Sequence, residues 1–351
     1  MYDLAIIGAG PAGAALACAL AARWRVVLID KRPTPTHRIG EALVPAAGRI
    51  LRDFGLRDAF QALSSAPYVA NRSLWGSNTE DYRDFISDPE GCGWHIDRVA
   101  FETMLRTEAK ARGAECLLDH PLEQVTPGWH LQCGDTADFN ARFVVDATGR
   151  SAVLARRLGA HRIAHDKMVA RWCRVKTPPD TQTGISSVVT TPDGWWYHIA
   201  AKSSQSCEST LAFHSTSDLL PQGDRASFLD AAQGQPGLSE ILKYATPLTE
   251  PVITAAHTAR LDRLSGSNWI AIGDAGLCFD PIASRGIFHA LYSAYVAAAL
   301  IDERLRGHGD GFALYDSEMS RIYETYLGHR RAVYNTEKRW ADTVFWRSAQ
   351  A

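Results

Sequence analysis

The first thirty residues carry a hydrophobic pattern that predicts a strand, a turn, a helix and a second strand. Residues 2–7 form a short apolar run, residues 8–13 are rich in glycine, and residues 14–23 are rich in Ala and Leu. A second apolar run, residues 25–29, ends in Asp30. Two apolar strands joined by a glycine turn and a helix form the unit that binds a dinucleotide.

The glycines of this turn each have an expected task in such a unit. Gly8 makes the tight turn, Gly10 lets the backbone approach a pyrophosphate, and Gly13 lets the helix pack closely on the strand. The first turn of the helix adds free N–H groups and a positive dipole end that favour phosphate. Asp30 is placed to accept both ribose hydroxyls of an adenosine. A glycine motif alone is weak evidence, but strand, helix and acid in this order favour a dinucleotide site over an ordinary glycine turn.

The middle of the chain has a different pattern. From about residue 165 to 260, apolar and polar positions alternate and Val, Thr and aromatic residues are frequent, which predicts an antiparallel sheet with one buried face. Apolar strands precede this region at residues 143–145 and follow it at residues 269–272, so the nucleotide-binding fold is interrupted and then resumed. A long cofactor such as FAD needs this return, because its flavin lies far from its adenine.

We therefore predict an α/β fold in which a Rossmann-like FAD-binding domain is interrupted by an antiparallel-sheet substrate domain and followed by C-terminal helices. Asp97 is a suitable N-cap for a helix over residues 98–111, and further helices are predicted over about 287–306 and 312–338. The predicted domains are residues 1–165 together with 261–310 for FAD, residues 166–260 for the substrate, and residues 311–351 for the C-terminal helical segment.

Composition and charge narrow the class of protein. The chain has 351 residues, of which 46% are apolar, and a net charge of −2, so about two globular domains are expected and nucleic acid is not the expected partner. Its 7 cysteines are scattered and form no Cys-x-x-Cys pair, which indicates reduced thiols of a cytoplasmic protein and no metal site. The first strand begins at residue 2, which leaves no room for a signal peptide. No apolar run approaches the roughly 18–20 residues of a membrane-spanning helix.

Three further motifs follow the glycine turn and Asp30. Residues 38–41 read Arg-Ile-Gly-Glu, residues 273–274 read Gly-Asp, and Pro281 is followed by Ser-Arg-Gly-Ile at residues 284–287. With these motifs the chain resembles the FAD-dependent monooxygenases of the p-hydroxybenzoate hydroxylase type, together with the flavin halogenases and the geranylgeranyl reductases. The resemblance implies FAD contacts from Gly8, Gly10, Pro11, Ala12, Gly13, Asp30, Lys31, Arg38, Arg98, Gly273, Asp274, Pro281, Gly286 and Ile287.

The resemblance also implies a place for each part of the cofactor. Arg38 and Arg98 would lie along the phosphate and ribityl region, and the Asp274 carboxylate would bind the ribityl chain. The backbone N–H groups of residues 284–287 would face the flavin pyrimidine edge, and the helix that begins there would favour the anionic reduced flavin. Two of these residues have a simpler interpretation, since Asp274 can cap a turn and Arg38 can be a solvated loop charge. Their occurrence in order and at suitable spacing favours FAD.

The three related classes differ in chemistry. The resemblance to halogenases requires a lysine in the segment from Arg32 to Ala109, and this chain has no lysine between Lys31 and Lys110. Halogenases also carry a Trp-x-Trp-x-Ile-Pro strand, whereas residues 194–200 read Gly-Trp-Trp-Tyr-His-Ile-Ala, with shifted Trp spacing and Ala in place of Pro. Geranylgeranyl reductases would need an apolar tunnel, but the middle sheet is rich in Trp, His and Ser. Hydroxylation is therefore favoured, with halogenation and lipid reduction as alternatives.

Hydroxylases of this kind use molecular oxygen on the reduced flavin as a C4a-hydroperoxide, which attacks an electron-rich ring. The flavin carries the chemistry, and the protein supplies positioning and a dry pocket, so neither a nucleophile nor a metal is needed from the protein. Alternation along the strand at residues 194–200 puts Trp196 and His198 on one face. The opposite face carries Trp195 and Tyr197, and one of the two faces should cover the flavin.

Four polar residues are candidates for catalysis or substrate binding. His198, His214 and His289 can act as acid–base groups or as substrate ligands, although a structural histidine is the more common case for each alone. The catalytic candidates are His289, one turn into the helix that begins at the flavin, Arg285 and His198. Arg285 can stabilise the reduced flavin or a substrate carboxylate, or it can point to solvent. The substrate pocket is expected to contain Trp196, His198 and His214.

The electron source and the substrate stay open at this stage. Single-component hydroxylases carry an Asp-Gly pair that serves both FAD and NADPH, whereas residues 146–150 read Asp-Ala-Thr-Gly-Arg. Electrons can therefore come from NAD(P)H directly or from a separate flavin reductase. The chain also resembles small halogenase-like maturases that hydroxylate tryptophan in a partner protein, so the substrate is either an aromatic small molecule or a partner polypeptide. A flavin-binding scaffold is the non-enzymatic alternative.

Overall fold

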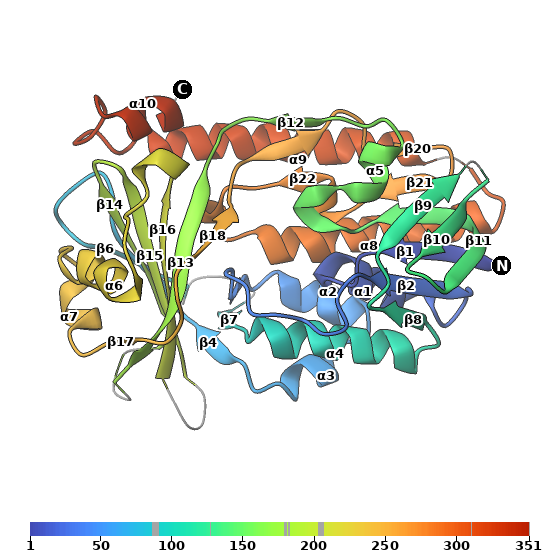
Figure 1. Cartoon of the computed structure of the whole chain (residues 1–351), viewed down its shortest axis with the longest axis horizontal. Coiled ribbons are helices and arrows are strands. Elements are labelled where there is room, and N and C mark those ends of the chain that lie inside the picture. The colour runs from blue at the N-terminus through green and yellow to red at the C-terminus, as the bar shows by residue number, and fades with distance from the viewer. Residues whose placement is uncertain are drawn as a thin grey trace.

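The computed structural model describes residues 1–85, 91–126, 128–178, 181, 183–202, 207–309 and 311–350. Two larger sheets lie at opposite ends of the molecule. In Figure 1 the sheet that contains β1 (Tyr2–Ile7) lies at the right, and the sheet that contains β13 (Val169–Thr177) and β16 (Cys207–Ser215) lies at the left. Helix α9 (Phe312–Tyr334) runs along the top from one end to the other, above helix α8 (Gly286–Leu305).

The first sheet has the parallel centre expected of a dinucleotide-binding domain. Its further strands are β2 (Val26–Asp30), β8 (Glu115–Leu118), β11 (Ala137–Asp146), β20 (Ser265–Gly266) and β21 (Trp269–Ala271), with a meander of β9 (Leu122–Thr126) and β10 (His130–Cys133) beside β11. The order is β20-β21-β11-β1-β2-β8, and only the β20 pairing in this path is antiparallel. Residue Ile270 pairs with Val145, so the segment after the middle sheet returns to the nucleotide-binding fold, as predicted.

Small residues bring the helices close to this sheet. Helix α1 (Pro11–Leu20) consists of Ala, Gly, Leu, Cys and Pro, is almost entirely buried, and packs against α8. The predicted cap of helix α4 (Arg98–Ala111) is confirmed, because the Asp97 carboxylate accepts hydrogen bonds from the N–H groups of Val99 and Ala100 at 2.8 and 3.1 Å. The sequence therefore set both the helix start and the close packing at the N-terminus.

The second sheet confirms the predicted antiparallel region but includes more of the chain. It adds β5 (Ala70–Leu74), β6 (Asp81–Asp84), β14 (Ile185–Thr191), β15 (Gly194–Lys202), β17 (Thr246–Pro247) and β18 (Val252–Ala255). The order is β17-β13-β16-β15-β14-β5-β6, and β18 also pairs with β13. Residues 70–84, which the predicted domains place in the FAD-binding part, pair with this second sheet. β5 pairs in parallel with β14, from far along the chain, and no local pattern reveals such a partner.

The two faces of the second sheet have different neighbours. On one face, helices α6 (Arg225–Gln233) and α7 (Ser239–Leu242) cover an apolar core, at the far left of Figure 1. In this core the ring of Trp196 packs against Phe213 and Phe228, with centroids 4.9 and 5.0 Å apart. The opposite face of the sheet is turned toward the first sheet and its helices.

The C-terminal helices differ from the prediction in two respects. Helix α9 ends at Tyr334 rather than at residue 338, and a further helix, α10 (Val344–Gln350), follows it. The indole N–H of Trp346 in α10 donates to the Thr191 carbonyl at 2.8 Å, so the end of the chain is bonded to the second sheet.

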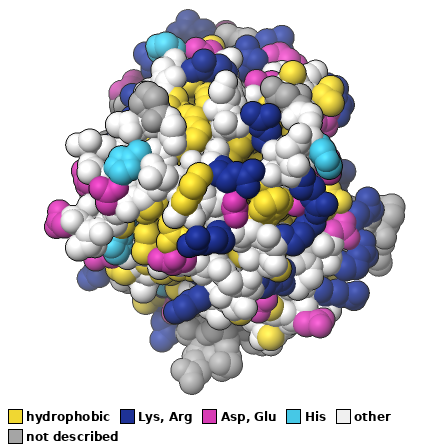
Figure 2. All heavy atoms as spheres, turned by 90° about the vertical axis from the view of Figure 1, so that its right-hand side faces the viewer, with side chains coloured by type: hydrophobic (Ala, Val, Ile, Leu, Met, Phe, Trp, Pro, Cys, Tyr) yellow, Lys and Arg dark blue, Asp and Glu magenta, His cyan; other side chains and the backbone are white. Residues whose placement is uncertain are grey.

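Short elements complete the described chain. One three-stranded sheet contains β3 (Ala42–Leu43), β7 (Gly93–His95) and β4 (Ala66–Tyr68), another contains β12 (Arg162–Ala164), β19 (Ala259–Leu261) and β22 (Leu277–Cys278), and the short helices are α2 (Ala47–Asp53), α3 (Arg57–Gln61) and α5 (Val153–Arg157). Within the described ranges, no helix is long and apolar enough to cross a membrane. Figure 2 shows basic side chains interspersed with acidic and apolar ones on the face at the right of Figure 1.

A buried ion pair ties α9 to the loop that precedes α8. The Nε atom of Arg330 donates to Asp280 Oδ2 at 3.1 Å, and the two side chains are 4% and 0% exposed. The Tyr334 hydroxyl donates to the same oxygen at 2.8 Å. Removal of one partner from a buried pair leaves the other charge without compensation, which is strongly destabilising.

We expect Arg330→Met to lower the free energy of unfolding by about 3–5 kcal/mol, because the Asp280 carboxylate would lose its cation. Urea denaturation followed by fluorescence measures this change. The neighbouring Arg331 is exposed, so Arg331→Met serves as the control and should change stability by about 0.5 kcal/mol or less. Equal stability of the two variants would contradict the importance of the pair.

Candidate functional site

A cavity of about 850 Å³ has walls from both sheets. Its lining includes the N-terminal glycine turn, Asp30 and residues of the loop at 281–287. Strands β13, β15, β16 and β18 of the second sheet contribute a further wall. One cavity therefore connects the motifs that the sequence analysis assigned to different parts of a dinucleotide cofactor.

The glycine turn has the geometry that its sequence predicts. Gly8 has φ +109°, and a Cβ there would lie 2.2 Å from the Ala147 carbonyl oxygen. A Cβ at Gly13 would lie 1.9 Å from the Gly8 carbonyl oxygen, so the close approach of helix and strand requires glycine. Around a Cβ at Gly10 there is open space, and Gly10 lines the cavity together with Pro11. The N-terminus of α1 has no side-chain cap, so its N–H groups stay available to a phosphate.

The Asp30 carboxylate is held in place by the protein itself. Its Oδ2 atom accepts a hydrogen bond from the Ala9 N–H at 2.8 Å, and its Oδ1 atom accepts one from the Arg32 N–H at 2.9 Å. Arg106 of α4 lies 3.4 Å from Oδ2 and donates to the Ala9 carbonyl at 2.9 Å. An ionised carboxylate has about four acceptor positions, so sites remain for ribose hydroxyls. Arg106 was not anticipated, because nothing in an amphipathic helix marks one buried arginine.

The two arginines named for the phosphate region both line the cavity, next to Lys31. Arg98 donates to the carbonyls of Ile39 and Gly40 at 3.3 and 3.1 Å, and it pairs with Glu102 at 2.6 Å. Its hydrogen bonds thus fix the segment that carries Arg38. Arg98 supports the cavity wall as well as lining it.

The Gly-Asp motif at residues 273–274 lies against α1. A Cβ at Gly273 would lie 2.9 Å from the Ala12 side chain, so this contact also needs glycine. Asp274 lines the cavity and pairs with Arg150 at 3.4 Å. Asp146, in contrast, caps its own turn by accepting hydrogen bonds from the Thr148 hydroxyl and the Ala155 N–H, both at 2.7 Å. Asp146 thus caps a turn, whereas Asp274 lines the cavity, where its predicted contact with the ribityl chain stays a prediction.

The loop before α8 brings a second helix N-terminus to the same cavity. Pro281, Arg285, Gly286 and Ile287 all line it, and α8 has no side-chain cap. Ser284 adopts φ +49°, which turns the backbone just before the helix begins. The N-termini of α1 and α8 thus both border one cavity, and the residues present fit the two anionic parts of FAD.

The alternation in β15 decides which of its side chains line the cavity. Trp195 and Tyr197 line the cavity, and Trp196 packs into the core under α6 on the opposite face. His198 shares the face of Trp196, and its burial lowers its pKa to about 3. This finding corrects the expectation that Trp196 and His198 form part of the substrate pocket. The physical reason for Trp196 is that α6 covers it, since its ring packs against Phe228 of that helix.

His214 and His289 differ in their relation to the cavity. His214 lines it and stacks on Trp195, with ring centroids 3.8 Å apart, and burial lowers the pKa of His214 to about 3. His289 does not line it; its ring packs on Phe279 at 4.7 Å, and burial lowers its pKa to about 4. Residues of α8 advance by about 100° each, so the turn that points Ala290 into the cavity carries His289 away from it. His289 and His198 are therefore outside the cavity, and Arg285 is the catalytic candidate that lines it.

The aromatic strand also requires a correction of its spacing. When residues 194–200 are aligned on Ile199 with the Trp-x-Trp-x-Ile-Pro pattern, Trp195 takes the first tryptophan position and Tyr197 the second. The spacing is thus retained and the second tryptophan is replaced. Both side chains line the cavity. The lysine that lines the described cavity is Lys31, which follows Asp30 in the chain.

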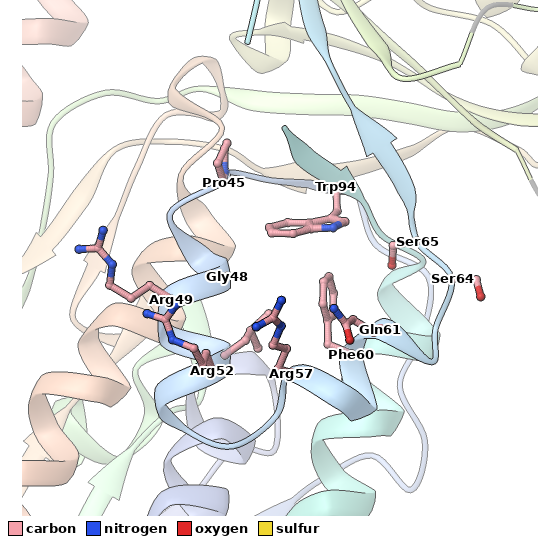
Figure 3. Close-up of a pocket in the computed structure, with 11 residues that line it drawn as sticks. Pro45, Gly48, Arg49, Arg52, Arg57, Phe60, Gln61, Ser64, Ser65 and Trp94 are labelled. Carbon is pink, nitrogen blue, oxygen red and sulfur yellow. The ribbon is translucent and has the colours of Figure 1, made fainter. Parts of the chain in front are cut away.

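Figure 3 shows a separate hollow of about 420 Å³ between α2, α3 and β7. Trp94 and Phe60 meet edge to face there, with centroids 5.3 Å apart, and Arg57 points into the space beneath the Trp94 ring. Gly48 permits this arrangement, because a Cβ would lie 3.0 Å from the Trp94 ring. The other lining residues are Pro45, Arg49, Leu51, Arg52, Gln61, Ser64 and Ser65. The two hollows share no lining residue, so this one is distinct from the dinucleotide cavity.

The chain belongs to the FAD binding domain family, which matches residues 1–327. The class predicted from the sequence, an FAD-dependent oxidoreductase, is thereby confirmed.

The named relatives include an FAD-dependent oxidoreductase and a flavin-dependent halogenase. The chain is 27% identical to the putative FAD-dependent oxidoreductase LodB of Marinomonas mediterranea, over 100% of this chain and 97% of that protein. It is 26% identical to the flavin-dependent halogenase armH3 of Armillaria mellea, over 93% of this chain and 72% of that protein.

Two solved structures share the fold across the whole chain. The myxobacterial chondrochloren halogenase CndH has a TM-score of 0.87 at 23% identity, over 100% of this chain and 86% of that one. The peptidyl tryptophan dihydroxylase QhpG, described as essential for tryptophylquinone cofactor biogenesis, has a TM-score of 0.76 at 22% identity, over 100% of this chain and 79% of that one. These matches agree with the predicted α/β architecture.

We expect Gly10→Val to abolish FAD retention without unfolding the protein, because a side chain there would fill only the space that the pyrophosphate needs. The ratio of flavin to protein absorbance after gel filtration measures retention, and circular dichroism measures folding. Gly328→Val is the matched control, since Gly328 also has open space around a Cβ but lies outside the cavity lining. Full FAD retention by Gly10→Val would contradict the assignment.

Proposed function

We propose that this protein is an FAD-dependent monooxygenase that hydroxylates an aromatic substrate. The observation that carries the proposal is the wall at the flavin end of the cavity, which is built from Trp172, Trp195, Tyr197 and His214. Such a wall offers flat apolar surface for an aromatic ring and excludes water. It lies on the sheet face that is opposite to the α6 core, so these side chains are not needed to fill that core.

The cofactor would supply the oxygen chemistry when reduced. In the overall reaction, one atom of molecular oxygen replaces a ring hydrogen as hydroxyl, the other leaves as water, and the two electrons come from the reduced flavin. NAD(P)H or a separate flavin reductase would restore those electrons. The protein's own part is to bind and orient: the N-terminus of α8 and Arg285 would stabilise negative charge on the reduced ring system, and the aromatic wall would hold the substrate ring above it.

Halogenation is the second candidate function, favoured by the halogenase relatives. In this cavity, however, the lysine side chain available is Lys31, at the Asp30 end. The resemblance assigns to halogenases a lysine that guides hypohalous acid, and the aromatic wall here offers none within the described residues. Hydroxylation needs only proximity between the ring and the activated oxygen.

The substrate is proposed to be an electron-rich ring, either free or carried by a polypeptide. QhpG supports the second form, because that protein is described as a peptidyl tryptophan dihydroxylase and its fold matches along the whole chain. The exposed strand β18 at the edge of the cavity leaves room for a larger substrate.

We expect the product to gain one oxygen atom from molecular oxygen, with or without halide. Mass spectrometry after incubation of the reduced FAD-loaded protein with candidate aromatic compounds and peptides, under ¹⁸O-labelled oxygen, measures this gain. Parallel reactions with chloride, bromide or neither provide the comparison. A halide-dependent product that contains chlorine or bromine would refute hydroxylation and support the second candidate.

The non-enzymatic alternative, a flavin-binding scaffold, predicts different oxygen kinetics. Stopped-flow mixing of the reduced protein with oxygen should give a transient absorbance that differs from both reduced and oxidised flavin, because the closed aromatic wall limits water. A slow, featureless reoxidation that no aromatic compound alters would instead favour the scaffold.

A further inference from the structure

Tyr197 brings a hydroxyl group to the aromatic wall of the cavity. The residue lines the cavity from β15 and is half-buried. Its hydroxyl makes no hydrogen bond within the described part of the chain, and it is not among the fully enclosed polar atoms. The hydroxyl therefore stays available on a side chain that lines the cavity.

The surroundings keep this hydroxyl neutral. Burial, together with the nearby Glu41 and Tyr68, raises the pKa of Tyr197 well above its ordinary value. No hydrogen bond joins Glu41 to the Tyr197 hydroxyl among the described residues; the Glu41 oxygens accept hydrogen bonds from Thr210 and the Gly40 N–H at 2.5 and 2.9 Å. A neutral phenol has one donor and can also accept.

The other polar atoms of the aromatic wall are already used or enclosed. The indole N–H of Trp195 donates to the Tyr334 hydroxyl at 3.1 Å, and the indole N–H of Trp172 donates to the Thr254 hydroxyl at 3.2 Å. Both ring nitrogens of His214 are enclosed. Among the described wall residues, the Tyr197 hydroxyl is the polar side-chain group that can meet a ligand.

The residue type at this position adds an acceptor. In the Trp-x-Trp-x-Ile-Pro pattern the second tryptophan falls at residue 197, and an indole can only donate, whereas a tyrosine hydroxyl can also accept. Electron-rich rings that suit oxygenation are mainly phenols and indoles, and both carry a donor, O–H or N–H. We propose that Tyr197 is a specificity-determining residue whose hydroxyl oxygen accepts a hydrogen bond from the ring N–H or O–H of the aromatic substrate, an inference that rests on the proposed function.

Binding of paired probes to the FAD-loaded protein tests this role without turnover. The pairs are indole with 1-methylindole, and phenol with anisole, where methylation removes the donor. Titration followed by the perturbation of the flavin absorption gives the dissociation constants. In at least one pair, the natural protein should bind the probe with the donor more tightly than the methylated probe. This preference should be about threefold to tenfold larger than the preference of Tyr197→Phe, as one hydrogen bond allows. The pair that responds distinguishes an indole from a phenol substrate.

Two further variants separate the alternatives. Tyr197→Trp keeps a donor but no acceptor, so it should lose the preference as Tyr197→Phe does. Tyr68→Phe removes a nearby hydroxyl that bonds to Ser186 and does not line the cavity, so it should keep the preference. All variants should retain FAD equally.

Three results would overturn the inference. An unchanged preference in Tyr197→Phe would show that the hydroxyl does not select the substrate, and a retained preference in Tyr197→Trp would show that it donates rather than accepts. Failure of all four probes to bind the natural protein would instead count against the proposed function itself, and the inference would fall with it.

Discussion

The cavity depends on the buried carboxylate of Asp280, which connects α9 with the loop that leads to α8. One oxygen accepts hydrogen bonds from Arg330 and Tyr334 of α9, and the other accepts one from the Ile282 N–H at 2.9 Å in the loop that leads to α8. Burial raises the pKa of Asp280, and Arg330 opposes that effect. Because the pair is fully enclosed, its geometry is fixed by several bonds rather than by solvent.

The hydrogen bonds of Asp280 also connect the loop before α8 with the aromatic wall. The Tyr334 hydroxyl that donates to Asp280 accepts a hydrogen bond from the indole N–H of Trp195, so one side chain links the two. The loop continues through Pro281 to Gly286, where the second helix N-terminus meets the cavity. Helix α9 thereby completes the site, although it contributes no lining residue to it.

Close backbone contacts shape the cavity beside α1. Gly8, Gly13 and Ala147 leave no room for larger side chains, so the turn after β1 and the turn after β11 meet there. Gly10, Gly149 and Gly286 line the cavity with open space around a Cβ, and at these points backbone can approach a ligand. A long cofactor with two anionic regions requires both kinds of position, close backbone packing and open points at which backbone N–H groups can reach it.

Much of this arrangement was readable in the chain because it is local. The N-terminal unit depends on residues 2–30, whose strands, turn and helix contact one another directly, so spacing and residue type were sufficient. Asp97 and its helix are another local case. The return of the fold at residues 269–271 was also predicted, because a fully apolar strand followed by Gly-Asp leaves few other interpretations.

The tertiary structure decided what a repeating pattern leaves undetermined. A period of two divides β15 into two faces but does not say which one α6 covers, and so the pattern could not choose between Trp195 with Tyr197 and Trp196 with His198. A helical period likewise did not reveal that His289 turns away. Arg106, Arg330, Tyr334 and strands β5 and β6 come from distant parts of the chain. Their partners are chosen by packing and burial, which act between segments that sequence spacing does not relate.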